Sequence, residues 1–379
     1  MLDVAIFRFS LRNDMPEMTG TCNYSIDLLA EWLKQALKAD ASDLHLVCGY
    51  PPVLRTFGKL APIDDEEMLV PSRISAAIEP ILSSEQKAQF ERELNLDFAT
   101  EVEINGQKSR FRVNLFQACG SLGACLRVIP ESIPDFSWTS FPKELSVRLG
   151  AFANGLVLFT GITGSGKSTS LAMIVEQLNR HNSQRILTIE DPIEYRFPSY
   201  ANSVVTQREV GRDVHSFADG LRYGLRQDPD VILVGEIRDI ETARMALSAA
   251  ETGHLIFSTL HTRDAKGSIS RYADFFPQQM QNEIRSQLAS GLRAVICQRL
   301  VPSNVEGEKQ ELALEILFNT PAVGAAIRSG KLESIDNNIV TGRSEGMISM
   351  DESIKRLLAE GRISRASAES LISDRAMLR

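Results

Sequence analysis

The sequence predicts an α/β fold: a parallel sheet between two layers of helices, preceded by a smaller α+β domain. The chain has 379 residues, which is enough for two domains or three. From about residue 150, short and continuous apolar runs alternate with helical stretches, as expected for strands buried on both faces of a parallel sheet. Between residues 25 and 132, one helical segment is followed by short strand-like runs, and these indicate the smaller domain.

The composition excludes several classes of protein. Hydrophobic residues make up 43% and charged residues 24%, so the chain can bury a core and is not expected to be disordered. The net charge of −8 argues against dedicated nucleic-acid binding, which requires a basic surface. The five cysteines form no CxxC pair, so neither a structural zinc site nor a disulfide framework is expected. No uncharged apolar run approaches the ~18 residues of a membrane helix. We therefore expect a cytoplasmic protein.

The first part of the chain is expected to contain an N-terminal tail, residues 1–24, and a domain at residues 25–132. Apolar residues at helical spacing predict a helix (Leu29, Trp32, Leu33, Ala36 and Leu37). Strands are predicted at Asp43–Cys48, Val53–Phe57, Ser109–Phe116 and Gly123–Val128. The prolines Pro130, Pro134 and Pro142 then mark an interrupted connection to the second domain, residues 133–379.

The second domain carries four apolar runs that predict strands: Leu156–Thr160, Ile186–Ile189, Val231–Val234 and Leu255–Leu260. A long helix is expected after Gln278, with one apolar side made by Met280, Ile284, Leu288, Leu292 and Val295. A hairpin of Val295–Val301 and Leu312–Phe318 should follow, with a polar turn at Asn304–Gln310. Gly330 and Gly361 are the expected stop signals of the C-terminal helices.

The segment Gly161-Ile-Thr-Gly-Ser-Gly-Lys-Ser168 matches the phosphate-binding pattern G-x-x-x-x-G-K-[ST]. It directly follows one predicted strand and opens a helix, which is the required context. Glycines allow the backbone N–H groups to surround phosphates at the positive end of the helix. Lys167 is expected to neutralise the β and γ oxygens, and the Ser168 hydroxyl to reach Mg²⁺. The sequence thus predicts a nucleoside-triphosphate site made by Gly161, Thr163, Gly164, Ser165, Gly166, Lys167, Ser168 and Thr169.

Acidic residues and histidines end the neighbouring strands. Ile189-Glu-Asp-Pro-Ile-Glu194 follows the second strand of this domain, and Val234-Gly-Glu236 ends the third. Ligands bind at the carboxyl ends of parallel strands, so these carboxylates can face the phosphates. One must orient or deprotonate the attacking water, and another must hold Mg²⁺ directly or through water. Asp191 and Asp239 are as readily explained as caps of the next helix. His254 and His261 suggest a sensor of the γ-phosphate, with a structural role as the alternative.

These motifs occur in the order found in the secretion ATPase superfamily, the hexameric motors of type IV pili and type II secretion. The N-terminal stretches Ala41-Ser-Asp-Leu-His45, Phe111-Arg-Val-Asn114 and Leu126-Arg-Val-Ile-Pro130 resemble those of PilT-type retraction ATPases. The resemblance covers about residues 26–360. Pilus-assembly ATPases usually carry a tetracysteine zinc site after the histidine box; only Cys297 lies there, so the assembly class is disfavoured.

The resemblance implies a fold and a set of roles. It implies a PAS-like first domain, a RecA-like motor domain, a six-subunit ring, and an inner-membrane pilus platform protein as partner. Glu194 matches the proposed catalytic base. Glu236 matches the Walker B glutamate, which is expected to hold Mg²⁺, directly or through water. His254 and His261 match the histidine-box pair, and Arg112 and Arg127 match arginines that the small domain brings to the nucleotide. The membrane association that it implies is peripheral, through partners, at the cytoplasmic face of the inner membrane.

The segment Ala322-Val-Gly-Ala-Ala-Ile-Arg-Ser329 departs from the A-I-R-N-L-I-R-E of retraction motors, because it lacks the first arginine and the acid. This leaves open an accessory PilT-like paralogue, or an ATPase of a related secretion or conjugation system. A nucleotide-switched adaptor and a DNA motor are two further hypotheses. Arg208, Arg222 and Arg226 are additional candidates for contacts with phosphate. Arg222 and Arg226 should share one face of a helix, and a surface ion pair is the competing role for each.

Overall fold

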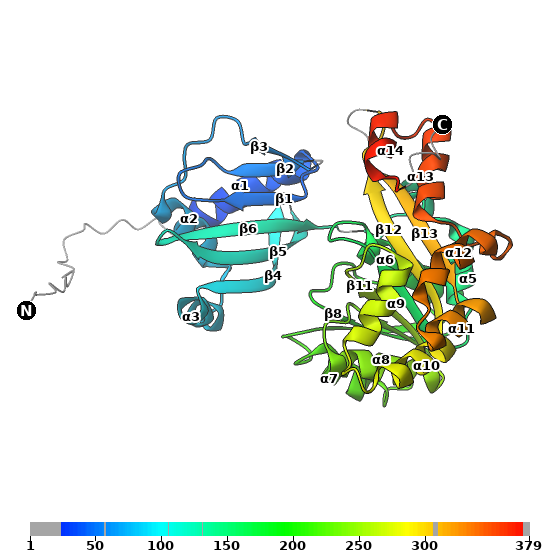
Figure 1. The fold of residues 1–379 in the computed structure, drawn as a ribbon. Helices are drawn as coiled ribbons and strands as arrows, with labels where there is room; N and C mark the ends of the chain where they lie inside the picture. Colours follow the sequence, from blue (N-terminus) through cyan, green and yellow to red (C-terminus); the bar gives the residue numbers. More distant parts are fainter. Residues whose placement is uncertain (1–23, 57, 105, 131, 306–309, 374–379) are drawn as a thin grey trace, which may run out of the picture. The chain divides into compact units, whose positions relative to one another are not determined.

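The computed structural model describes residues 24–56, 58–104, 106–130, 132–305 and 310–373. Almost all of the predicted N-terminal tail lies outside these residues. The contacts within the chain divide it into two compact units, Met1–Val128 and Ile129–Arg379. Each unit has its own hydrophobic core, and each is described separately (Figure 1).

The first unit is a mixed sheet-and-helix structure. Its elements are α1 (Tyr24–Lys38), β1 (Asp43–Leu46), β2 (Val53–Thr56), β3 (Lys59–Pro62), α2 (Pro71–Ile78), the 3-10 turn η1 (Glu79–Ile81), α3 (Ser84–Glu93), β4 (Asn95–Ile104), β5 (Gln107–Ala118) and β6 (Ser121–Ile129). The strand order is β3-β2-β1-β6-β5-β4. Leu44, Phe111, Val113 and Leu126 are fully buried and form the core with Trp32 of α1. Their neighbours along each strand therefore point to the other face of the sheet.

The second unit contains the predicted parallel sheet. Its first half consists of α4 (Phe136–Thr139), α5 (Lys143–Gly150), β7 (Gly155–Thr160), α6 (Lys167–His181), β8 (Arg185–Glu190), β9 (Val204–Glu209), α7 (Phe217–Gly224), β10 (Val231–Val234), α8 (Ile240–Glu251) and β11 (Leu255–Leu260). Its second half consists of α9 (Ala265–Asp274), α10 (Gln281–Gly291), β12 (Leu292–Val301), β13 (Glu311–Phe318), α11 (Pro321–Ser329), η2 (Leu332–Ser334), α12 (Ile335–Thr341), η3 (Gly342–Glu345), α13 (Met350–Ala359) and α14 (Arg365–Leu371).

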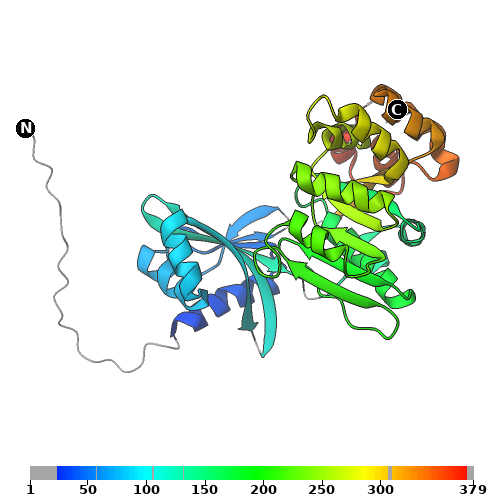
Figure 2. The same ribbon diagram turned by 90° about the horizontal axis from the view of Figure 1, so that it is seen from below.

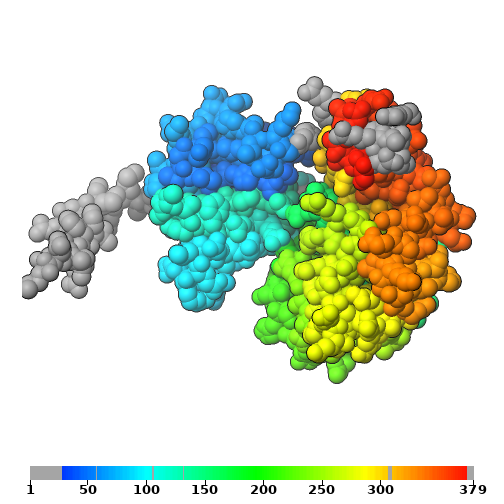
Figure 3. All heavy atoms as spheres, in the orientation of Figure 1, coloured from blue at the N-terminus to red at the C-terminus, as the bar shows by residue number. Residues whose placement is uncertain are grey.

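The sheet of this unit has the strand order β13-β12-β7-β11-β10-β8-β9. All neighbouring strands are parallel except β12 and β13, which form the predicted hairpin. Helices lie on both faces: α5 packs beside α6 on one face, and α8 beside α10 on the other (Figures 1 and 2). The segments after β13, orange to red in Figure 3, gather on one side of the unit. β7 and β11 are buried at every position, because both faces of the sheet are covered.

The predicted strands of the second unit are confirmed, and the long helix after Gln278 is partly wrong. The helix α10 ends at Gly291, so Leu292 and Val295 lie on β12 rather than on a helix face. The run from Leu292 is apolar enough to be buried on both sides, and pairing with β7 and β13 satisfies its backbone. The edge strand β9 was not predicted, because its Thr-Gln-Arg-Glu sequence lacks an apolar run.

The predicted stop signals are confirmed by the backbone. Gly330 ends α11 with a positive φ of 69°, and Gly361 follows α13 with a φ of 70°. Part of the predicted turn Asn304–Gln310 lies outside the described residues. Within the portion of the chain that the structure describes, no helix combines the length and the apolar character needed to cross a membrane.

Candidate nucleotide-binding site

The phosphate-binding loop joins β7 to α6, as predicted. Gly161 leaves the strand with a φ of 143°, a conformation that only glycine adopts readily. A Cβ atom at this position would also overlap the Gln298 carbonyl oxygen and the Ser165 hydroxyl. Gly166 caps the N-terminus of α6 with a φ of 85° and contributes no side-chain hydrogen bond. The backbone N–H groups in the first turn of α6 therefore receive no hydrogen bond from a capping side chain.

The remaining loop residues differ in exposure. Thr163, Gly164 and Ser168 are exposed, whereas Ser165 is buried and its Oγ contacts no hydrogen-bond partner in the described structure. The Thr169 hydroxyl lies 3.0 Å from the Tyr195 hydroxyl, so it is already engaged with the segment that follows β8. The loop thus offers a hydroxyl, Ser168, at the surface next to the positive end of a helix.

Lys167 is buried within the loop. Its Nζ donates to the carbonyl oxygens of Gly161 at 2.8 Å and Ile162 at 3.0 Å. Desolvation lowers the pKa of Lys167, and the negative charges of Glu236 and Glu194 oppose this effect. The lysine and both predicted carboxylates therefore belong to one electrostatic cluster.

Glu190, the last residue of β8, adds a carboxylate to which the sequence motif gave no role. Burial raises its pKa from 4.5 to about 7. Hydrogen bonds from Thr188 at 2.6 Å, Gln207 at 3.2 Å and the Glu194 backbone oppose the shift. Glu190 therefore titrates near neutral pH directly before the acidic segment that carries Glu194.

Glu236 lies just after β10 and is 13% exposed. One of its carboxylate oxygens pairs with the Arg238 guanidinium, and the other lies 3.2 Å from Nε2 of His261. A second nitrogen of Arg238 lies 3.4 Å from Asp191. Asp191 therefore takes part in an ion pair, whereas Asp239 caps α8 by accepting from the Thr242 N–H at 2.8 Å.

The prediction that both histidines lie where strands end is wrong, because His254 precedes β11 and only His261 follows it. His261 follows Leu260, which pairs with Thr160 immediately before the phosphate loop. His254 precedes Leu255, which pairs with Gly155 at the other edge of the sheet, and its carbonyl accepts from the Gly155 N–H. His254 instead bonds to the carbonyl of Ala249 at 3.1 Å. Of these two histidines, the register thus brings only His261 to the phosphate loop.

Arg112 and Arg127 belong to the first unit, on the sheet face opposite to its core. Arg127 pairs with the buried carboxylate of Asp43 at 2.9 Å, and Nε of Arg112 lies 3.9 Å from Asp97. About half of the Arg127 side chain is exposed. Their assignment to the nucleotide stays a prediction.

The other candidate arginines, Arg208, Arg222 and Arg226, contact carboxylates or backbone carbonyls of neighbouring residues. Arg222 pairs with Asp219 and Glu241, which is the competing role expected of a surface ion pair. α7 ends at Gly224, so Arg226 does not share a helix with Arg222; it donates to the Arg222 carbonyl instead. Arg208 donates to the backbone of Asp213.

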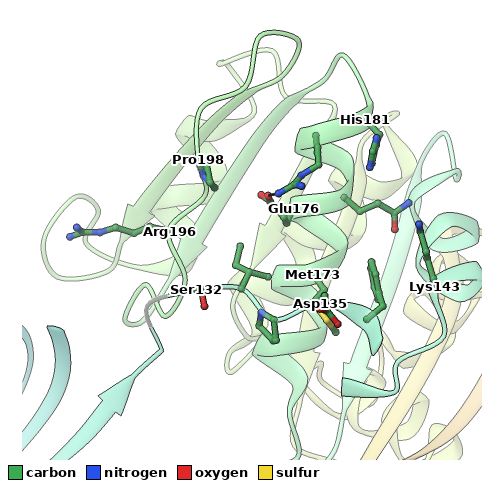
Figure 4. A pocket seen from close by; sticks show the side chains of 13 residues that line it. Ser132, Asp135, Lys143, Met173, Glu176, His181, Arg196 and Pro198 are labelled. Atoms are coloured by element: carbon green, nitrogen blue, oxygen red, sulfur yellow. Dashed lines mark hydrogen bonds and ion pairs between the residues drawn. The ribbon is translucent and has the colours of Figure 1, made fainter. Parts of the chain in front are cut away.

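A cavity of about 440 Å³ lies along α6, away from the phosphate loop. Its walls come from Ser132 and Asp135 before α4, Met173 and Glu176 on α6, and Arg196 after β8 (Figure 4). No predicted site residue lines it. Glu176 is engaged at this wall by Arg180 at 2.8 Å and by Tyr200 at 2.7 Å.

Gln298 on β12 is a site residue that the sequence analysis missed. Its amide nitrogen donates to Ser170 Oγ at 3.0 Å and lies 3.4 Å from the Ser165 carbonyl, while its amide oxygen has no partner in the described structure. The sequence offered only a weak indication of this contact, namely a glutamine inside an otherwise apolar run.

Comparison with known proteins identifies the family. The family model described as "Type II/IV secretion system protein" matches residues 22–362. The "Type IV pilus retractation ATPase PilT" of Pseudomonas aeruginosa is 43% identical over 340 residues, which cover 90% of this chain and 96% of that protein. A crystal structure of "the Pilus Retraction Motor PilT and Bound ADP" matches with a TM-score of 0.79 and 39% identity, over 92% of this chain and 97% of that one.

An X-ray structure of the ATPase DotB from Legionella pneumophila matches with a TM-score of 0.78 and 28% identity, over 94% of this chain and 97% of that one. The match between this chain and DotB extends over the small first unit as well as the unit with the phosphate loop. The matched range also confirms the predicted fold, a RecA-like ATPase unit preceded by a smaller N-terminal one. The chain therefore belongs to the type II/IV secretion system protein family and is an ATPase of that family.

Proposed function

We propose that this ATPase powers type IV pilus retraction, as a ring of six copies that couples ATP hydrolysis to disassembly of the pilus fibre. The observation that carries the proposal is the phosphate loop between β7 and α6, in a chain 43% identical to a retraction ATPase over nearly the full length of both proteins. The structural similarity to an ADP-bound retraction motor supports the same nucleotide for this loop.

Lys167, Ser168 and the N-terminus of α6 are the groups that hold the phosphates. The positive end of the helix favours anions. The Lys167 ammonium group is held inside the loop by hydrogen bonds to two carbonyl oxygens. On nucleotide binding, phosphate oxygens replace those carbonyls as acceptors. Thr163, Gly164 and Gly166 contribute backbone rather than side-chain contacts.

The residues present fit Mg²⁺, which prefers oxygen ligands and commonly takes one or two carboxylates together with substrate phosphates. Ser168 and Glu236 supply a hydroxyl and a carboxylate at the loop. Among the described residues there is no group of three or more His, Cys, Asp or Glu side chains that would hold a metal alone. When bound, Mg²⁺ neutralises charge that develops on the phosphate oxygens.

Glu194 is the proposed base for the attacking water. Its charge acts on Lys167, Glu190 and Tyr195, so its carboxylate belongs to the site rather than to the distant surface. We assign Arg112 and Arg127 to stabilising charge on the nucleotide. A guanidinium in that role contributes ~10³–10⁵ in rate in other phosphoryl-transfer enzymes.

The test measures ATP hydrolysis against protein concentration, with Glu194→Gln as the comparison. We expect a rate that rises faster than linearly while subunits assemble into rings, because the site is completed by assembly. Glu194→Gln should keep nucleotide binding and lose most turnover. Equal turnover in Glu194→Gln and wild type would remove Glu194 as the base.

We further propose that the ring works at the cytoplasmic face of the inner membrane, on a pilus platform protein. Deleting the gene should leave pili on the cell surface and abolish twitching. Normal twitching in the deletion strain would count against retraction.

A second candidate function is an accessory motor, or the motor of a related secretion or conjugation system. Two observations favour it: the altered segment Ala322–Ser329, which forms most of α11, and the match of residues 22–362 to the family model described as "Type II/IV secretion system protein". A deletion strain with normal pili and normal twitching, but with a defect in the export of a protein, would favour this candidate.

A further inference from the structure

Arg238 contacts two carboxylates of the nucleotide site at once. One guanidinium nitrogen pairs with Glu236, and another lies 3.4 Å from the Asp191 carboxylate. Glu236 follows β10, whereas Asp191 opens the connection from β8 to β9. One side chain therefore ties together two chain segments that each carry a proposed functional glutamate.

Glu236 has both of its oxygens engaged. Arg238 takes one, and Nε2 of His261 lies 3.2 Å from the other. Lys167 of the phosphate loop does not pair with Glu236, because its Nζ donates to the carbonyls of Gly161 and Ile162. Among the arginines and lysines that the structure describes, Arg238 is thus the one that pairs directly with the Glu236 carboxylate.

A carboxylate lone pair that accepts from a guanidinium is not available to a metal ion, and the positive charge of the guanidinium repels the metal. Mg²⁺ demands a near-ideal shell of oxygen ligands at about 2.1 Å, which leaves no room for an N–H donor on the same lone pair. Arg238 can yield, because 56% of its side chain is exposed, against 13% for Glu236. The flexible, solvated partner moves while the enclosed carboxylate stays in place.

We propose that Arg238 is a positioning residue that competes with Mg²⁺ for Glu236. It holds Glu236 and Asp191 together before the metal arrives with its nucleotide, and it releases Glu236 when they bind. Asp191 remains as its second partner and keeps the guanidinium close. The inference rests on the proposed function, because it takes Glu236 as the carboxylate on the Mg²⁺ side.

The experiment titrates Mg²⁺ into a fixed concentration of a fluorescent ADP and protein, and follows bound nucleotide rather than turnover. Arg238→Gln should lower the Mg²⁺ concentration at half-saturation by about two- to fivefold, the factor that a partly exposed ion pair is worth. Arg238→Lys keeps a charge but cannot span both carboxylates, so its midpoint should lie between those of Arg238→Gln and wild type.

Arg244→Gln is the matched control. Arg244 is another exposed arginine, one turn into α8, and it contacts the Phe276 ring and Met280 rather than a carboxylate of the site. Its removal changes the net charge equally and should leave the Mg²⁺ midpoint unchanged. A midpoint for Arg238→Gln equal to or higher than that of wild type would overturn the proposal.

The double variant tests whether Arg238 acts through Glu236. In a Glu236→Gln background, Arg238→Gln should produce no further shift of the midpoint. A shift of the same size in both backgrounds would mean that Arg238 acts by long-range charge and not by competition.

Lys167→Ala separates failure of this inference from failure of the proposed site. If Lys167→Ala binds fluorescent ADP as well as wild type does, the nucleotide binds elsewhere and both proposals are wrong. If Lys167→Ala loses binding while Arg238→Gln leaves the midpoint unshifted, the nucleotide site stands and only the competition by Arg238 is refuted.

Discussion

Replacing Glu190 by glutamine should stabilise the protein at alkaline pH and have little effect at acidic pH. The carboxyl of Glu190 at the end of β8 has its pKa raised from 4.5 to about 7 by burial. The folded protein therefore binds this proton more tightly than the unfolded chain does. Glutamine imitates the protonated form at every pH, and its oxygen can accept the same bonds from Thr188 and Gln207.

The sign follows from proton linkage. Below pH 4.5 the residue is protonated in both states, and its contribution to stability is fully present. As the pH rises to about 7, the unfolded chain loses the proton first, and this contribution is lost. The difference between 4.5 and about 7, at about 1.4 kcal/mol per pH unit, corresponds to at most about 3.5 kcal/mol. The residue keeps some contact with solvent, so screening reduces the expected gain to about 1–2 kcal/mol.

The assay compares thermal unfolding of Glu190→Gln and wild type at pH 5 and pH 8. For a unit of this size, 1 kcal/mol moves Tm by about 2–4 °C. We therefore expect a Tm for the variant that is several degrees higher at pH 8, and a much smaller difference at pH 5. Glu251→Gln, an exposed carboxylate at the end of α8, is the control and should show no pH-dependent difference. A Tm difference that is the same at both pH values would refute the reasoning, because it would not come from the raised pKa.

Three further variants test the phosphate loop, and one of them is a control. Gly161→Ala places a Cβ against the Gln298 backbone at a φ of 143°, so stability should fall by about 1–3 kcal/mol and nucleotide binding should be lost. Gly164→Ala has open space at a φ of 79° and should cost less; equal Tm losses for the two variants would contradict the overlap. Gln298→Leu removes the bond to Ser170 and should lower stability by about 1–3 kcal/mol and weaken binding of fluorescent ADP. Unchanged Tm and affinity would show that this bond does not hold the loop in place.

Much of the site could be predicted from the sequence, because its chemistry is local. The phosphate loop needs glycines at fixed positions, a strand before it and a helix after it, all within one short segment. The strands of the second unit were predictable for a similar reason, since burial on both faces requires an unbroken apolar run. The segment after Gly291 was wrongly predicted because an apolar run by itself does not distinguish a helix from a strand.

Contacts between distant segments were decided only by the tertiary structure. The register of β11 against β7 places His261 by the phosphate loop and His254 at the opposite end of the strand, although the two lie in one sequence motif and only β11 separates them. The strand order places Arg238 between Glu236 and Asp191, and it lays β12 beside β7, with Gln298 against the loop. By itself, the sequence predicted the phosphate loop and the carboxylates and histidines that flank the neighbouring strands, but not Gln298. Pairing between strands far apart in the chain determined which of them meet, because hydrogen bonds and ion pairs act only over the few ångströms that packing brings together.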